Sequence, residues 1–391
     1  MRYAPVTEAL ADLGGAKWAV HARGRAMAAA GRDVIELTIG EPDVPPPAVL
    51  VEAMAEAART GRTAYSSGRG EAGLLDALAD RYSARMGRAI GPDQFLCVPG
   101  TQTALYVAMQ GLVGAGDEVL VADPLYATYE GVIRAAGAAM VPVPLDPAAG
   151  FRLDPAAFAA RVTARTRAIL LNSPHNPTGT VATRDEVRAI GTVAAAHDLW
   201  IVSDEVYEEL IFDGPFASPF AEPALAERTV VVSSISKSHA APGLRSGWIA
   251  APAEAAARLL PVAETMLFGN QPFIADATAL AVAGPSAVAG EMRRAYAARA
   301  DLLAGRLAGG SLRVHRPEAG MFALVDVGGT GMDGDAYAAD LLDAQGVSVM
   351  PGSAFGSVLR DWVRVALTVP DAALGAACDR MTAHAAALQS A

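Results

Sequence analysis

The chain has 391 residues, of which 52% are hydrophobic. This length exceeds what one hydrophobic core usually organises, so we expect two domains. A formal net charge of −11 without any basic cluster argues against nucleic acid or an anionic membrane as a partner. No apolar run is long enough to span a bilayer, and residues 1–10 contain charges and a proline, unlike a secretory signal. We therefore expect a cytoplasmic protein.

In chain order, apolar runs rich in Val and Ile alternate with helical stretches. The sequence predicts buried strands at 95–98, 118–122, 168–172, 199–203 and 229–234. It predicts covering helices at 102–113, 126–137 and 183–197. This alternation indicates a mostly parallel α/β sheet. Ligands bind outside the carboxyl ends of the strands in such sheets, so the residues after each strand are candidates for a site.

The C-terminal part has a different pattern, with a long helix after Pro285 and strand-like stretches at 320–327, 346–350 and 361–367. We predict that residues 1–43 form an N-terminal arm and part of a small domain. Residues 44–284 would form a large α/β domain, and residues 285–391 a small α+β domain. Cys97 and Cys378 are too few for a disulfide framework, and no Cys or His spacing predicts a metal site.

The strongest local motif is Ser234-Ile235-Ser236-Lys237, which follows a predicted strand and precedes Arg245 on a Gly-rich turn, 243–248. A lysine flanked by hydroxyl groups and an arginine suits a ligand that carries a phosphate and reacts with an amine. An ordinary loop lysine is one alternative. A Ser-x-x-Lys acyl-enzyme motif is another, but its companion tripeptides Ser-Asp-Asn and Lys-Thr-Gly are absent from the sequence.

Two further motifs follow predicted strands. Asp204 comes directly after one strand, where a buried carboxylate needs a cation such as a protonated pyridine nitrogen; a helix N-cap or a metal ligand is the alternative. Asn176 lies in the turn 172–179, which contains two X-Pro bonds and can hold the amide towards a ring oxygen and a carboxylate. A turn Asn that bonds its own backbone is the alternative here.

Three weaker signals complete the candidate site. Gly100-Thr101-Gln102 opens a helix directly after a strand, so its backbone N–H groups form an anion site, although plain capping is also possible. Tyr126 can stack on a planar ring, or be a core aromatic. Arg364 alternates with Trp362 and Ala366 on a predicted strand and needs an anion, either a bound carboxylate or an internal Asp or Glu.

Taken in order, Asn176, Asp204, Tyr207, Lys237, Arg245 and Arg364 make the chain resemble the class I/II aminotransferases, which are fold-type I pyridoxal 5'-phosphate (PLP) enzymes of the aspartate aminotransferase family. The resemblance covers nearly the whole chain, from 39–43 to 351–356. It implies an α/β fold with a large PLP-binding domain and a small α+β domain. It also implies a homodimer that moves an amino group between an amino acid and a 2-oxo acid.

The resemblance further implies roles for individual residues. Lys237 would form a Schiff base with PLP and act as the base, Asp204 would pair with the pyridine nitrogen, and Tyr207 with Asn176 would bind the ring oxygen. Tyr126 would stack on the ring. The phosphate would be held by Gly100, Thr101, Gln102, Ser234, Ser236, Arg245 and, from the other subunit, Tyr65. The substrate carboxylate would be held by Gly40, Asn176 and Arg364.

Within the family the chain resembles arginine:pyruvate transaminases in particular, which implies arginine or another guanidino amino acid as substrate. A guanidinium requires an acidic or carbonyl-rich pocket, for which Glu8 and Asp12 are candidates, with surface charge as the alternative. Other amino donors, such as aspartate, aromatic or neutral amino acids, remain open, as does a PLP-dependent lyase, decarboxylase or oxidase. A regulator would need a DNA-binding module, and motifs that begin by Gly40 leave no room for one.

Overall fold

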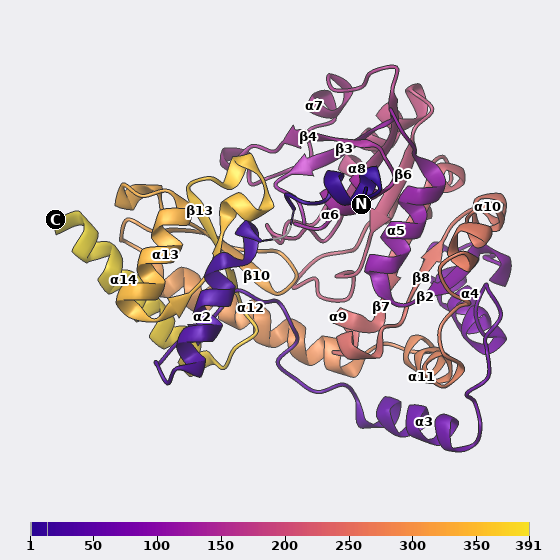
Figure 1. Ribbon diagram of the computed structural model, residues 1–391, viewed down its shortest axis with the longest axis horizontal. Coiled ribbons are helices and arrows are strands. Elements are labelled where there is room, and N and C mark those ends of the chain that lie inside the picture. Colours follow the sequence, from indigo (N-terminus) through magenta and orange to yellow (C-terminus); the bar gives the residue numbers. More distant parts are fainter. Residues whose placement is uncertain (1, 14, 391) are drawn as a thin grey trace.

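The computed structural model describes residues 2–13 and 15–390. A large sheet with its helices lies beside a smaller body that contains the C-terminal residues and α2 (Ala19–Ala29) (Figure 1). Within the described residues, no single helix is long and apolar enough to cross a membrane, although one bent pair, Pro272–Val282 with Ala287–Leu307, passes by length and composition.

The large sheet has seven strands in the order β2-β8-β7-β6-β5-β3-β4. Strand β8 runs antiparallel to both of its neighbours, and the other pairs are parallel, which confirms the predicted mostly parallel α/β sheet. The strands are β2 (Phe95–Val98), β3 (Glu118–Asp123), β4 (Ala139–Pro144), β5 (Thr166–Asn172), β6 (Trp200–Asp204), β7 (Thr229–Ser234) and β8 (Gly247–Ala250). The sequence analysis missed β4, and it assigned Gly247 and Trp248 to a turn although they begin β8.

Helices cover both faces of this sheet because alternate side chains of each strand point to opposite faces. On β5, Leu170 packs into the core cluster with α5 and α10, whereas Ile169 and Leu171 pack into the cluster with α8. The helices around the sheet are α3 (Ala48–Arg59), α4 (Ala72–Met86), α5 (Gly100–Leu112), α6 (Tyr129–Ala135), α7 (Pro155–Ala159), α8 (Arg184–Ala196), α9 (Ile235–Ser238), α10 (Ala253–Glu264) and α11 (Pro272–Val282).

The smaller body has a four-stranded antiparallel sheet in the order β12-β13-β10-β9, with a parallel pair β1-β11 beside it. Its core contacts the helices α12 (Ala287–Leu307), α13 (Gly334–Gln345) and α14 (Asp371–Ser390). The strands are β1 (Ile35–Glu36), β9 (Arg313–His315), β10 (Phe322–Asp326), β11 (Val347–Ser348), β12 (Met350–Pro351) and β13 (Trp362–Ala366). The boundaries that we assigned to the domains stay a prediction.

Candidate active site

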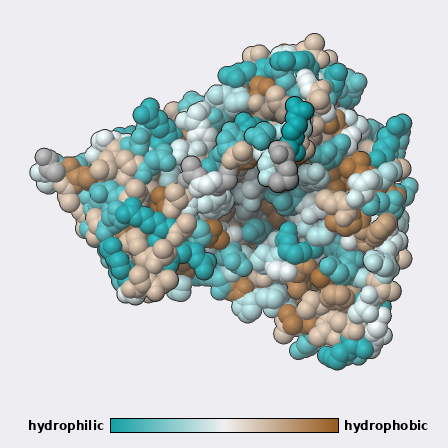
Figure 2. Space-filling view, in the orientation of Figure 1, coloured by the Kyte–Doolittle hydropathy of each residue, from teal (hydrophilic) through white to brown (hydrophobic). Residues whose placement is uncertain are grey.

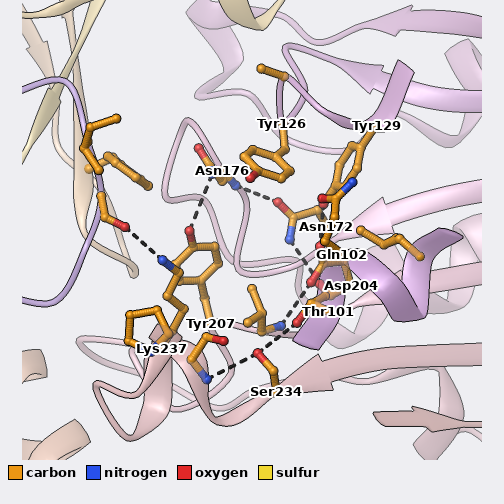
Figure 3. Close-up of a pocket in the computed structure, with 18 of the residues that line it drawn as sticks. Thr101, Gln102, Tyr126, Tyr129, Asn172, Asn176, Asp204, Tyr207, Ser234 and Lys237 are labelled. Carbon is orange, nitrogen blue, oxygen red and sulfur yellow. Dashed lines mark hydrogen bonds between the residues drawn. The ribbon is translucent and has the colours of Figure 1, made fainter. Parts of the chain in front are cut away.

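A cavity of about 240 Å³ lies at the carboxyl ends of β5, β6 and β7, against the N-terminus of α5 and strand β13 (Figure 3). The structure brings most of the predicted site residues to its wall: Gly40, Thr101, Gln102, Tyr126, Asn176, Asp204, Tyr207, Ser234, Ser236, Lys237, Arg245 and Arg364. Gly100 is not part of the wall but begins α5, next to Thr101, which is. Tyr65 is not part of the wall and is 95% exposed.

Lys237 lies on α9, the short helix that follows β7, and its Nζ donates a hydrogen bond to the Gly40 carbonyl oxygen at 2.8 Å (Figure 3). Glycine at position 40 leaves room for Phe322, since a Cβ there would lie 1.9 Å from the Phe322 ring and would force it to shift. Burial lowers the pKa of Lys237 to about 8; Glu41 opposes this shift, and Arg364 and Arg245 add to it. The lysine is therefore far more easily deprotonated than a lysine in water.

Asp204 is the last residue of β6, and both of its carboxylate oxygens accept hydrogen bonds. Tyr129 Oη donates to Oδ2 at 2.8 Å, and the Val206 backbone N–H donates to Oδ1 at 3.2 Å. Burial raises the pKa of Asp204 to about 6, while these two bonds lower it. The residue starts no helix, and within the described chain no group of His, Cys, Asp and Glu could hold a metal ion. The sequence analysis missed Tyr129.

The turn after β5 joins the two sides of the cavity. Asn172 Nδ2 donates to the Asp204 carbonyl oxygen at 3.1 Å, and Asn172 Oδ1 accepts from the Asn176 backbone N–H at 2.8 Å. Asn176 Nδ2 in turn donates to Tyr207 Oη at 3.5 Å. The peptide bonds before Pro174 and Pro177 are both cis. Asn172 thus ties the ends of β5 and β6 together, a role that we did not predict for it.

Arg364 lies on the central strand β13, between β12 and β10. Its Nη1 donates to Asn176 Oδ1 at 3.1 Å, and its Nη2 donates to the Thr38 carbonyl oxygen at 2.7 Å. The guanidinium lies 3.8 Å and 4.3 Å from the ring centroids of Phe322 and Phe355.

Burial lowers the pKa of Arg364 to about 10. Among the described residues it has no carboxylate within salt-bridge distance, and its Nε lacks a hydrogen-bond partner. The internal Asp or Glu that we considered as an alternative is therefore not found. A buried guanidinium without an anion is costly, so this one suits a bound carboxylate.

Hydroxyl groups and a helix N-terminus form an anion-binding cup at the other end of the cavity. Thr101 Oγ1 donates to Ser234 Oγ at 2.9 Å, and Ser234 Oγ also accepts from the Ser236 backbone N–H at 3.3 Å. The Arg245 guanidinium covers Gly100, where a Cβ would lie 2.3 Å from its Nη2. Backbone N–H groups, hydroxyls and a guanidinium are the donors that a phosphate prefers.

The chemistry of these groups fits PLP. The cup offers donors to a phosphate, Asp204 offers a buried carboxylate to a protonated ring nitrogen, and Lys237 offers an amine of lowered pKa to an aldehyde. Glu8 and Asp12, our candidates for a guanidinium pocket, do not line the cavity; Asp12 instead pairs with Arg134 at 2.7 Å.

Comparison with known proteins assigns the family. Residues 32–381 match the family model of aminotransferase class I and II. The chain is 42% identical over 389 residues to an arginine–pyruvate transaminase of Pseudomonas aeruginosa, with 99% of each chain covered. It is 32% identical over 373 residues to an aspartate aminotransferase of Musicola paradisiaca, with 93% of each covered. The solved structure of Thermus thermophilus aspartate aminotransferase with maleate superposes with a TM-score of 0.92 at 31% identity, covering 98% and 100% of the two chains.

The fold and the site therefore define a PLP enzyme of fold type I. The chain belongs to the class I/II aminotransferase family, and it is a PLP-dependent enzyme that moves an amino group between an amino acid and a 2-oxo acid. The family, fold, activity and cofactor that the sequence resemblance implied are confirmed.

Proposed function

We propose that the enzyme transfers the amino group of arginine, or of another guanidino amino acid, to a 2-oxo acid such as pyruvate. The observation that carries this proposal is the 42% identity over nearly the whole chain to an arginine–pyruvate transaminase. The charges in the cavity argue against aspartate. Among the described residues of one chain its only cations are Lys237, Arg245 and Arg364, so this chain itself offers none for the second carboxylate of aspartate.

We infer that each predicted residue has a distinct binding role. Arg364, with Asn176 and the Gly40 backbone, holds the α-carboxylate of the substrate, because the guanidinium is buried, unpaired and fork-shaped. The cofactor is held by the Gly100, Thr101 and Gln102 amides, Ser234, Ser236 and Arg245 at its phosphate, Tyr126 on its ring face, Tyr207 and Asn176 at its ring oxygen, and Asp204 at its ring nitrogen.

Proton transfer then depends on two groups of the chain. PLP, when bound, supplies a ring that accepts the electron pair released from the substrate Cα. Asp204 stabilises the positive charge on the ring nitrogen as a buried carboxylate, and Tyr129 holds that carboxylate in its ionised form. Lys237 Nζ would take the proton from the substrate Cα and deliver it to C4′ of the cofactor, across the nitrogen that joins the two carbons. Its lowered pKa, about 8, makes this possible near neutral pH.

We also propose a homodimer in which Tyr65 of each chain reaches the phosphate in the other subunit. Tyr65 lies outside its own cavity, and its ring packs edge-to-face on Phe268, which is itself 56% exposed. Val49 and Val51 on α3 and Leu280 on α11 are also exposed. Apolar surface gathers over this part of the molecule (Figure 2), as an interface requires. The cytoplasmic location stays a prediction.

A substrate panel tests the proposed reaction. Purified enzyme is given L-arginine, L-alanine and L-aspartate, each with pyruvate or with 2-oxoglutarate, and the 2-oxo acid product is measured. We expect arginine with pyruvate to give the highest kcat/KM. Lys237→Ala should abolish turnover and the visible absorption of the bound cofactor. Arginine no better than alanine or aspartate would contradict the substrate, whereas the aminotransferase activity would stand.

A further inference from the structure

The side chain of the substrate must lie against wall residues that the cofactor and the α-carboxylate do not engage. The cofactor and carboxylate groups occupy the floor, and Phe322 and Phe355 enclose the Arg364 guanidinium. Trp18 and Ile39 are partly exposed wall residues without such a role, and both come from the N-terminal segment that carries Gly40. This pair is therefore positioned to meet the substrate side chain.

A guanidinium that enters the mouth of the cavity meets no acidic side chain in the described wall, although Glu41, next to the wall residue Gly40, lies near enough to Lys237 to act on its charge. Among the described residues, Asp204 is the only acidic residue that lines the cavity, and it lies on the floor. Two carboxylates nearby are already paired: Glu130 with Lys17 at 3.6 Å and Asp12 with Arg134 at 2.7 Å. Guanidinium groups also bind to aromatic faces, and tryptophan is the best of these partners.

Trp18 is held in place relative to the carboxylate-binding group. It belongs to a 3-10 turn, Ala16–Trp18, and packs against the core cluster that includes Phe355. Its ring also packs edge-to-face with that of His21, with 6.3 Å between the ring centroids. His21 Nδ1 shares a hydrogen bond with Thr38 Oγ1 at 2.7 Å, and the Thr38 carbonyl oxygen accepts from Arg364. The indole therefore has a defined position relative to the group that binds the α-carboxylate.

We propose that Trp18 forms a wall of the side-chain subsite and selects guanidinium-bearing amino acids by cation–π stacking. This inference rests on the proposed function, since it explains how the enzyme would prefer arginine. It names a specificity residue and assigns Trp18 no part in the proton transfer.

Kinetics with a matched pair of substrates tests the role of Trp18. Citrulline has nearly the shape of arginine but carries a neutral urea group in place of the guanidinium. We expect Trp18→Leu to lower kcat/KM for arginine by about 3- to 30-fold, the range for a cation–π contact, and to change kcat/KM for citrulline much less. Trp18→Phe keeps an aromatic face that attracts a cation less strongly, so its kcat/KM for arginine should lie between those of the wild type and Trp18→Leu.

A binding measurement separates recognition from chemistry. The probe is 5-guanidinopentanoate, which has the guanidinium and the carboxylate but no α-amine, with 5-ureidopentanoate as its neutral counterpart. We expect the inhibition constant of the guanidino acid alone to rise in Trp18→Leu. The visible absorption of the cofactor and a normal unfolding transition verify that each variant is folded. If Trp18→Leu does not fold, the same kinetic and binding measurements are made on Trp18→Phe.

The outcomes distinguish the two proposals. A wild type that does not prefer arginine to citrulline would refute both the guanidino substrate and the selection by Trp18. A wild type that prefers arginine, with variants that keep the same preference, would overturn the role of Trp18 alone. Equal losses for arginine and citrulline would also overturn it, because contact with the shape of the side chain rather than with its charge would then explain the effect.

Discussion

Replacing Tyr129 with phenylalanine tests whether its hydroxyl keeps Asp204 ionised. Tyr129 Oη donates to Asp204 Oδ2 at 2.8 Å, and both side chains are buried. Among the residues that the structure describes, the only other hydrogen bond to this carboxylate comes from the Val206 backbone N–H at 3.2 Å. Tyr129→Phe removes the first bond and leaves the ring, which packs edge-to-face with Tyr126 at 5.4 Å.

The expected size of the effect follows from the strength of a hydrogen bond to a charged group. Such bonds contribute about 1.5–3 kcal/mol, which corresponds to a rise of about one to two units in the pKa of Asp204. In the PLP-free protein this pKa is already raised from 3.8 to about 6 by burial. The stability that Asp204 contributes is therefore greatest below pH 3.8 and is lost as the pH rises through about 6.

In Tyr129→Phe this loss extends to higher pH because the folded-state pKa is higher still. The free energy of unfolding of the PLP-free protein, from urea transitions at several pH values, measures it. We expect the deficit of the variant to be small near pH 5 and to grow to about 1.5–3 kcal/mol by pH 8. In an Asp204→Asn background the same substitution should have an effect that does not depend on pH. A deficit that is constant with pH in the wild-type background would refute the reasoning.

Three other predictions concern the cup, the carboxylate site and the base. Gly100→Ala should raise the dissociation constant of PLP, since its φ is +79° and a Cβ would lie 2.3 Å from a guanidinium nitrogen, whereas Gly243→Ala, with open space around it, should not. Arg364→Lys should raise KM for the amino acid about tenfold or more without changing PLP affinity, because a lysine cannot reproduce the two-pronged geometry. Lys17 and Lys237 are the only lysines. In a PLP-free Lys17→Arg variant, modification of Lys237 by an amine reagent should therefore rise with a midpoint near pH 8, and a midpoint near the ordinary 10.5 would contradict the lowered pKa.

The sequence predicts the sheet well where its strands are fully buried, because such strands are continuous apolar runs. Strand β4 was missed because it contains Pro142 and Pro144 and is mostly half-exposed, so its hydrophobic signal is weak. Strand β8 was missed because Gly247 and Trp248 follow a turn, and no local pattern shows that the chain returns antiparallel between β2 and β7.

The site residues that follow strands were predictable because parallel strands bring their carboxyl ends to one edge. Residues that act through another residue could not be predicted from the sequence. Tyr129 lies 75 positions from Asp204, and only the packing of α6 against the sheet brings its hydroxyl to the carboxylate. Trp18 is similar, since the sequence suggested the acidic Glu8 and Asp12 for a guanidinium and had no signal for an indole at the mouth.

The charges of the cavity explain why an indole suits this position. The described wall carries Lys237, Arg245 and Arg364 against the single carboxylate of Asp204, although the whole chain has a net charge of −11. The excess of positive charge favours the phosphate and the α-carboxylate, which bring the compensating negative charges. A guanidinium gains nothing by approaching these cations, so its favourable place is at the mouth. A neutral π face attracts it there without adding a carboxylate that would compete with the substrate for Arg364.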